Sequence, residues 1–164
     1  MRVLPQRHGV ITGRGSVQDN CEDVYNALAR TADYNVALIH GGKSQEQREE
    51  SIKGFRTGDY DIMVATDVAG RGIDVKGVGM VINYDMPNNI QSYTHRIGRT
   101  GRAGRKGTAV TFLTAADEKV FYDLKQFLDD SKAPVPHQLA ASEASRVKPG
   151  SMDQARKDTT MYAA

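Results

Sequence analysis

The chain has 164 residues, 39% hydrophobic and 26% charged, a composition typical of one soluble globular domain with a real core. A formal net charge of +2 excludes a strong overall positive field, so any affinity for nucleic acid must come from local patches. A single cysteine excludes an internal disulfide, and the four histidines lack the spacing of zinc ligands. Without a secretory signal or an 18-residue apolar stretch, we expect an intracellular protein that does not span a membrane.

The opening residues, 1–18, carry few structural signals. Only residues 9–12 have the apolar character of a strand, and the glycines after them lack the third glycine of a dinucleotide-binding loop. A helix is expected from Asn20, which can act as its N-cap. Its apolar stripe is typical of a helix that faces a core and consists of Cys21, Val24, Tyr25 and Leu28.

Residues 35–40 form a short apolar run that predicts a buried strand. The sequence GGKS follows at 41–44 and is similar to the end of a phosphate-binding loop. The full loop needs a glycine at position 37, which is Ala37 inside the strand, so we reject a self-contained nucleotide loop.

A helix is expected directly after this turn. Ser44 and Gln47 have the spacing of a capping box, and Gly58 predicts the end of the helix. Gln45 and Arg48 lie three residues apart on its first turns. They can meet a phosphate backbone at the helix N-terminus, although spacing alone favours ordinary solvated residues.

A second buried strand, residues 60–66, leads into the sequence DVAGRGID at 67–74. In an open α/β sheet, ligands bind at the carboxyl ends of the strands, which is where this loop would lie. A carboxylate of Asp67 or Asp74 can accept hydrogen bonds from ribose hydroxyls, and Thr66 can reach a phosphate. Asp also favours helix N-caps and turns, so a functional loop and a plain turn both remain open on these residues alone.

The basic segment of the chain spans residues 95–106, with five Arg or Lys, three Gly and no carboxylate in the sequence HRIGRTGRAGRK. Three of its arginines recur every three residues, at Arg96, Arg99 and Arg102. A helical turn that passes into a glycine-bent loop would direct them at one target. Guanidinium groups bind phosphate bidentately and stabilise the charge of phosphoryl transfer, so we interpret the segment as carrying arginine fingers. The alternative is a solvated basic face.

Strand and helix alternate along the chain. Further strands and helices are expected, in chain order, at 79–84, after Asn88 or Asn89, at 108–113 and after Thr114. Short apolar strands that alternate with helices predict an α/β fold, with a mostly parallel sheet and helices on both faces. Residues 131–164 are rich in Ala, Ser, Pro and Lys and lack periodicity, so we expect a tail that is flexible or drapes over the domain.

Two stretches resemble the fifth and sixth motifs of DEAD-box RNA helicases: VATDVAGRGID at 64–74 and HRIGRTGR at 95–102. Further residues resemble the same family's second RecA-like domain, namely His40, Gly41, Gln45, Arg48, Phe55 and Gly58. The resemblance implies a RecA-like fold and three regions. These are a divergent N-terminal segment at 1–18, a helicase C-terminal domain at 19–130 and a C-terminal tail at 131–164.

The resemblance also implies a role for each matching residue. Arg99 and Arg102 match the arginine fingers that meet the γ-phosphate, and Asp74 matches the carboxylate that holds the nucleotide ribose. The residues that match those coupling the two helicase domains are Arg71, His95 and Arg96. The residues that match those lining the RNA backbone are Gly41, Gln45, Arg48, Thr66 and Gly70. No metal ligand is implied in this chain.

The nucleotide implied by the resemblance is ATP with Mg²⁺, bound jointly with a first RecA-like domain that this sequence does not contain. The chain alone is therefore expected to be inactive as an ATP hydrolase. Expected partners are that first domain and RNA, contacted through its backbone without sequence specificity. The sequences KPG at 148–150 and RKDTTMYA at 156–163 resemble the tail of the branch that acts in pre-mRNA splicing at the upstream splice site. This implies spliceosomal protein partners and a nuclear location.

The resemblance has one clear departure. The family's fourth motif is replaced by GVITGRG at 9–15, so the RNA contact and edge strand implied there are not carried over. The alternative function is an orphan RecA-like module that binds RNA or a protein without turning over ATP. A DNA translocase of the same superfamily is a third, and the sixth motif favours the RNA family over it.

Overall fold

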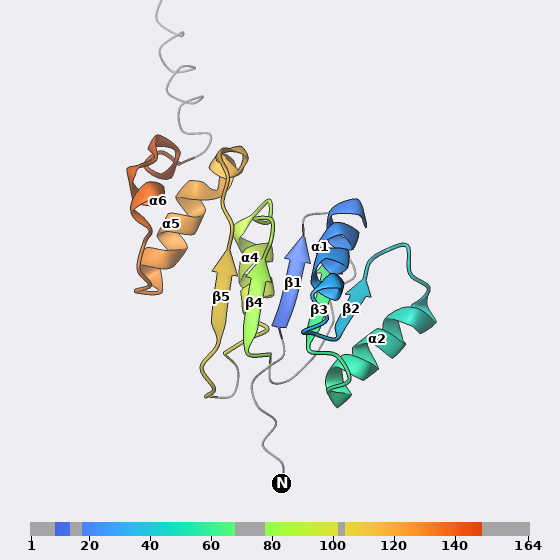
Figure 1. Ribbon diagram of the computed structural model, residues 1–164. Helices are drawn as coiled ribbons and strands as arrows, with labels where there is room; N and C mark the ends of the chain where they lie inside the picture. The colour runs from blue at the N-terminus through green and yellow to red at the C-terminus, as the bar shows by residue number, and fades with distance from the viewer. Residues whose placement is uncertain (1–8, 14–17, 68–77, 102–103, 149–164) are drawn as a thin grey trace, which may run out of the picture. The chain divides into compact units, whose positions relative to one another are not determined.

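The computed structural model describes residues 9–13, 18–67, 78–101 and 104–148. The described residues form five strands, β1 (Gly9–Gly13), β2 (Val36–Ile39), β3 (Ile62–Thr66), β4 (Met80–Asn83) and β5 (Thr108–Thr111). Neighbouring strands are parallel throughout, in the order β2-β3-β1-β4-β5 (Figure 1). The expected α/β fold with a parallel sheet is confirmed.

Strand β1 is the middle strand of this sheet. Gly9 pairs with Ile62 of β3 on one side and with Met80 of β4 on the other. The divergent opening of the chain therefore supplies a central strand, where the family resemblance had implied an edge strand. Val10 and Ile11 are both buried because successive side chains of a strand point to opposite faces, and both faces are covered at this position.

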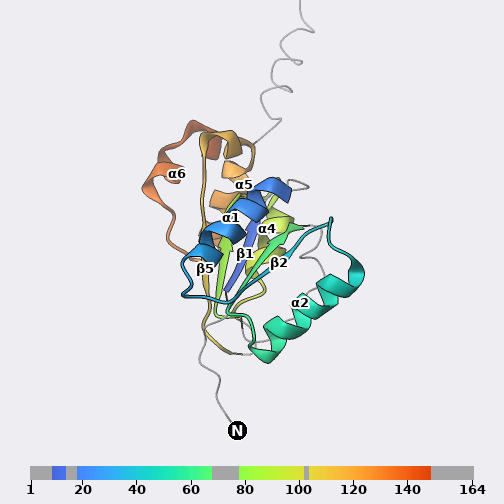
Figure 2. The ribbon, with the colours of Figure 1, turned by 45° about the vertical axis from the view of Figure 1, so that its right-hand side comes forward.

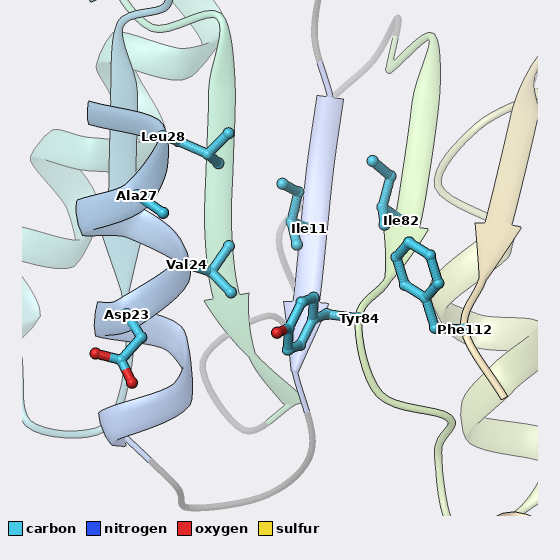
Figure 3. Close-up of a pocket in the computed structure, with 8 residues that line it drawn as sticks. All are labelled: Ile11, Asp23, Val24, Ala27, Leu28, Ile82, Tyr84 and Phe112. Carbon is cyan, nitrogen blue, oxygen red and sulfur yellow. The ribbon is translucent and has the colours of Figure 1, made fainter. Parts of the chain in front are cut away.

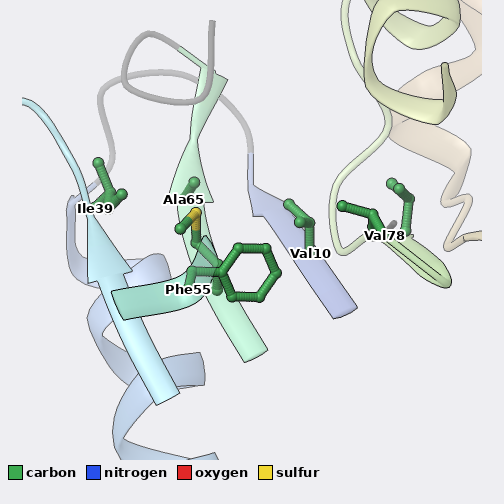
Figure 4. Packing of buried hydrophobic residues seen from close by; sticks show 7 residues of the cluster. Val10, Ile39, Phe55, Ala65 and Val78 are labelled. Carbon is green, nitrogen blue, oxygen red and sulfur yellow. The ribbon is translucent and has the colours of Figure 1, made fainter. Parts of the chain in front are cut away.

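Helices α1 (Gln18–Arg30) and α2 (Gln45–Thr57) cover opposite faces of the sheet (Figures 1 and 2). On one face, Phe55 of α2 packs into a buried cluster with Val78, which precedes β4, and with strand residues (Figure 4), which are Val10, Ile39, Met63, Ala65 and Val81. On the other face, the predicted α1 stripe packs against strand residues that include Ile11, Val36 and Val64. Both layers of helix are as the alternating pattern predicts.

The helix boundaries follow local capping chemistry in part. The capping box of α2 is confirmed, because Ser44 Oγ accepts from the Gln47 amide at 3.2 Å and Gln47 Oε1 accepts from the Ser44 amide at 3.1 Å. Gly58 ends this helix with a φ of 90°. The N-cap predicted at Asn20 is wrong, because α1 already begins at Gln18 and Asn20 lies within its first turn.

The described residues divide into two compact units. The first contains the sheet, α1, α2 and Tyr93–Phe112, and the second contains Asn88–Ser92 and the chain from Leu113 onward. Helix α4 (Ile90–Ile97) begins after Asn89, whose Oδ1 accepts from the Ser92 amide at 2.8 Å, so of the two predicted caps Asn89 is the one used.

The second unit is helical. It contains η1 (Ala115–Val120), α5 (Phe121–Asp130), α6 (His137–Ala141) and η2 (Glu143–Ser145). Asp117 Oδ2 accepts from the Thr114 amide at 2.9 Å, and the first turns after Thr114 are 3₁₀ where a continuous α-helix was expected. The tail expected from residue 131 contains regular structure in its described part, since α6 and η2 lie within it. Leu139 of α6 and Ser145 of η2 are buried. No helix among the described residues is long and apolar enough to cross a bilayer.

Candidate functional site

The carboxyl ends of β1, β3 and β4 meet at one buried guanidinium. Arg96, on the last turn of α4, is 4% exposed. Its Nε and Nη2 donate to the two carboxylate oxygens of Asp67, just beyond β3, at 2.5 and 2.6 Å. This is the bidentate geometry that a planar guanidinium forms with a carboxylate.

The remaining donors of Arg96 reach the other strand ends. Nη1 donates to the Asp85 carbonyl at 2.8 Å and to Asn83 Oδ1 at 3.3 Å, and Nη2 donates to the Gly13 carbonyl at 3.4 Å. A guanidinium has five N–H donors, so these contacts and the Asp67 pair satisfy the group completely. Arg96 therefore fixes the end of α4 to the sheet.

The basic segment leaves the sheet from this point. Its first amides continue the helical turn, with Gly98 donating to the Thr94 carbonyl at 2.9 Å and Thr100 to the Ile97 carbonyl at 3.1 Å. Thr100 Oγ1 then donates to the Val78 carbonyl at 2.6 Å, and these two residues also form a parallel bridge.

Glycines bend the segment after this bridge. Gly101 and Gly104 have φ values of 69° and 75°, which residues with a side chain rarely adopt. Gly107 allows a close approach, because a Cβ there would overlap the Thr100 hydroxyl and the Gly101 amide. The predicted helical turn followed by a glycine-bent loop is thus present.

A second group of predicted residues lies at the start of α2. His40 Nδ1 accepts from the Gly42 amide at 3.1 Å and so orders the turn that contains Gly41. Gln45 Oε1 accepts from Arg48 Nη1 at 3.3 Å, while Gln45 Nε2 donates to Glu49 at 2.7 Å. Gly41 and Gln45 are exposed and Arg48 is half-buried, so polar groups of this turn are accessible to a ligand.

Burial changes the proton affinity of two groups beside the network. The pKa of the Cys21 thiol is raised, mainly by burial, although a hydrogen bond with the Gly13 backbone opposes the shift. The pKa of the Tyr93 hydroxyl is also raised by burial, against the effect of its side-chain hydrogen bond with Thr111. Both groups are therefore neutral near pH 7.

Comparison with known proteins places these features in a family. Residues 12–104 match the helicase conserved C-terminal domain. The chain belongs to this family, in its DEAD-box branch. It is 53% identical over 150 residues to DEAD-box ATP-dependent RNA helicase 21 of Oryza sativa subsp. japonica, covering 87% of this chain and 20% of that protein.

Two further relatives share the name Prp28. The chain is 52% identical over 130 residues to the pre-mRNA-splicing ATP-dependent RNA helicase PRP28 of Yarrowia lipolytica, covering 79% of this chain and 22% of the relative. The crystal structure of the RNA helicase Prp28 from Chaetomium thermophilum bound to ADP matches with a TM-score of 0.70 and 47% identity. That match covers 80% of this chain and 33% of that one. The chain thus spans about a fifth of the length of the curated relatives it matches.

The structure of this helicase domain describes part of the predicted site. Arg99 is half-buried after α4, His95 is exposed on that helix, and Arg96 is buried at the carboxyl ends of β1, β3 and β4. Thr66 is 2% exposed at the end of β3. Four of the predicted site residues lie outside the described ranges, namely Gly70, Arg71, Asp74 and Arg102. The roles assigned to these eight residues stay predictions.

A hollow of about 440 Å³ opens on the α1 face of the sheet (Figure 3). None of the residues that line it is a predicted site residue. Tyr84 and Phe112 border it with an edge-to-face ring contact at 6.2 Å between centroids. Its lining has one carboxylate and no cationic side chain, and consists of Ile11, Asp23, Val24, Ala27, Leu28, Ile82, Tyr84 and Phe112. A phosphate would find no positive charge there.

The sequence reasoning missed two residues that shape the site. Asn83 belongs to the buried network around Arg96, and Gly107 lies against the turn of the basic segment. Asn83 follows an apolar strand run, where a buried amide gives no pattern. Gly107 ends the sequence GRKG at 104–107, but the partner that requires a glycine there, Thr100, is defined only by the fold.

Proposed function

We propose that the chain is the second RecA-like half of an ATP-dependent RNA helicase. In this function Arg99 and Arg102 act as arginine fingers on the γ-phosphate of ATP, and Asp74 holds its ribose. The supporting observation is that every donor of Arg96 has a hydrogen-bond partner at the strand ends. The end of α4, from which the following arginines extend, is therefore held in one position. Fixed cationic groups stabilise the charge of phosphoryl transfer without a cost of reorganisation.

The basic segment fits a phosphate. It contains no carboxylate, and the positive φ of Gly101 and Gly104 lets backbone approach an anion closely. ATP, when bound, supplies the phosphoryl group that is transferred. We assign the ligands of Mg²⁺ and the positioning of the attacking water to the first RecA-like domain, as the family resemblance implies.

The proposed RNA groove combines two regions of this domain. Gly41, Gln45 and Arg48 at the start of α2 present a turn and polar side chains to the backbone of a single strand. We assign further contacts to Thr66, at the end of β3, and to Gly70, which lies outside the described residues. We assign the coupling to the first domain to Arg71 and His95, and Arg96 acts by holding α4. Because the relatives include pre-mRNA-splicing helicases, we propose that the protein works in the nucleus with spliceosomal partners.

The proposal is tested in a complete helicase made by joining this chain to the first RecA-like domain of a close relative. Arg102→Lys keeps the charge and loses the planar fork, so RNA-stimulated ATP hydrolysis should fall by roughly 10³-fold, as for other arginine fingers. The affinity for ATP should change much less, because the contact strengthens in the transition state. Turnover is measured by phosphate release and affinity by a fluorescent nucleotide.

Arg105→Lys is the matched control, because Arg105 is exposed and lies just beyond the sixth motif. It should leave turnover nearly unchanged. Equal losses at positions 102 and 105 would contradict the assignment of fingers. A joined protein that binds single-stranded RNA but never hydrolyses ATP would favour the alternative of a non-enzymatic binding module.

A further inference from the structure

Asn83 is buried at the end of β4, where its amide touches three other elements. It is 0% exposed. Its Oδ1 accepts from Thr12 Oγ1 of β1 at 2.9 Å and from Arg96 Nη1 of α4 at 3.3 Å, and its Nδ2 donates to Thr111 Oγ1 of β5 at 2.9 Å. One side chain thereby joins two neighbouring strands to the helix that precedes the basic segment.

The amide reaches α4 at two points. One arm is the direct contact with Arg96. The other passes through Thr111, whose side chain also hydrogen-bonds Tyr93. Tyr93 and Arg96 are three residues apart, so they lie on the same face of the helix, and both are buried. Two anchors on one face restrain both the rotation and the translation of the last turn.

A single orientation of the amide satisfies all of its partners. The oxygen faces two donors, the Thr12 hydroxyl and the Arg96 guanidinium, while the nitrogen faces the Thr111 hydroxyl. A flipped amide would set its N–H groups against the guanidinium, which can only donate. The network therefore has one arrangement.

An uncharged acceptor suits this place. The bidentate partner of Arg96 is already Asp67, and a second carboxylate beside it would add an unpaired buried charge. Asn provides the acceptor for Arg96 and the donor for Thr111 without that charge. These properties distinguish Asn83 from a residue that merely fills space.

We propose that Asn83 is a positioning residue for the basic segment, holding the last turn of α4 through Arg96 and through Thr111 with Tyr93, and so setting the position of Arg99, which follows that turn. The use of that arginine in catalysis rests on the proposed function. The mechanical part, that this amide restrains the segment, does not depend on it.

Three variants separate the arms of the network. Asn83→Ala removes both connections of the amide to α4. Thr111→Val removes only the connection through Thr111 and Tyr93. Thr12→Val removes the Thr12 hydrogen bond to Asn83 and leaves both connections to α4 in place. The amides of Gly98, Arg99 and Thr100 are the reporters, since they form the turn directly after Arg96. Hydrogen exchange of these amides in the 164-residue chain is compared with that of the strand amides of Val64 and Val81.

We expect a graded response at the reporters relative to the strands. Asn83→Ala should speed their exchange by roughly tenfold beyond any change in the strands, because two buried connections are lost. Thr111→Val should have a smaller effect and Thr12→Val none. If Asn83→Ala does not fold, the difference between Thr111→Val and Thr12→Val decides alone. Equal changes at reporters and strands in all variants, or a Thr12→Val effect as large as that of Thr111→Val, would overturn the proposal.

The effect of this positioning on ATP hydrolysis is measured in the joined two-domain helicase. Thr111→Val should lower kcat severalfold with little change in KM for ATP, and Thr12→Val should leave both near the original values. An unaltered kcat despite faster exchange at the reporters would mean that the segment is positioned but not used in hydrolysis. A joined protein without ATPase activity would refute the proposed function, while the exchange result would still stand.

Discussion

Two groups of polar side chains in this domain differ in where their partners come from. At the start of α2, Gln45 bonds to Arg48 and Glu49, three and four residues along the same helix. At the strand ends, Arg96 bonds to groups 11 to 83 positions away in the chain and is 4% exposed. The first group is held by local structure and can rearrange around a ligand, whereas the second is held by the whole sheet and cannot.

Replacing the arginine of each group is the strongest test of this difference between the α2 group and the Arg96 network. Arg96→Met should lower the free energy of unfolding by roughly 3 to 5 kcal/mol, because Asp67 and Asn83 lose a buried partner. Arg48→Met should change it by less than about 1 kcal/mol, since its contacts are exposed. Urea unfolding followed by circular dichroism measures both. Similar losses for the two variants would show that the α2 group is as integral to the fold as the network.

Glycines in the two regions offer a second test. Gly107→Ala would push a methyl group into the Thr100 hydroxyl and the Gly101 amide, so we expect a loss of roughly 1 to 3 kcal/mol and a lower Tm. A Cβ at Gly41 would have no atom within 4 Å, and Gly41 lacks a positive φ, so Gly41→Ala should leave the Tm unchanged or slightly higher. A drop at Gly41 equal to that at Gly107 would contradict this packing.

Binding of RNA should show the opposite order, with the α2 group dominant. Arg48→Gln should weaken binding to single-stranded RNA, and losing one phosphate contact should reduce the slope of log K against log salt by about 0.7. Lys53→Gln on the same helix is the charge-matched control and should keep the slope. Fluorescence anisotropy over a salt series measures both. An unaltered slope in Arg48→Gln would remove Arg48 from the proposed groove.

The smallest expected effect concerns pH. Burial raises the pKa of the Cys21 thiol in the folded protein above its ordinary value of 9.0. The folded state therefore keeps this proton to higher pH than the unfolded chain, so the contribution of this thiol to the free energy of unfolding should be constant below pH 9 and be lost as pH rises beyond it. Cys21→Ala should reduce that loss and leave the part due to Tyr93, which begins near 10.0. An unchanged pH profile in the variant would contradict the role of this thiol.

The comparison also explains what could be predicted from the sequence. The capping box at Ser44, the glycine bends at Gly101 and Gly104 and the core-facing stripe of α1 all depend on residues within a few positions of one another, so spacing was sufficient. The start of α1 was misplaced because Gln18 has no distinctive capping chemistry.

Asn83 could not be found in this way. Its partners are 13, 28 and 71 residues away, and an amide at the end of an apolar strand does not reveal which side chains the sheet will bring to it. The central position of β1 could not be predicted for a similar reason. Its short apolar run does not reveal that β3 and β4 will pair with it on both sides. The sequence motifs indicated which segments matter, and only the fold shows what holds them.

The place of β1 also affects how the domain folds. Its residues precede those of the other four strands in the sequence, yet Gly9 pairs with Ile62 and Met80, and no pairing joins β1 to β2, the next strand in the chain. Until β3 has formed, β1 has no partner strand, and until β4 has formed, the other side of β1 is an open edge. Such long-range pairing slows folding and prolongs the exposure of unpaired strands. Substitutions in β1 should therefore reduce the yield of folded protein during synthesis more than their effect on the finished structure would suggest.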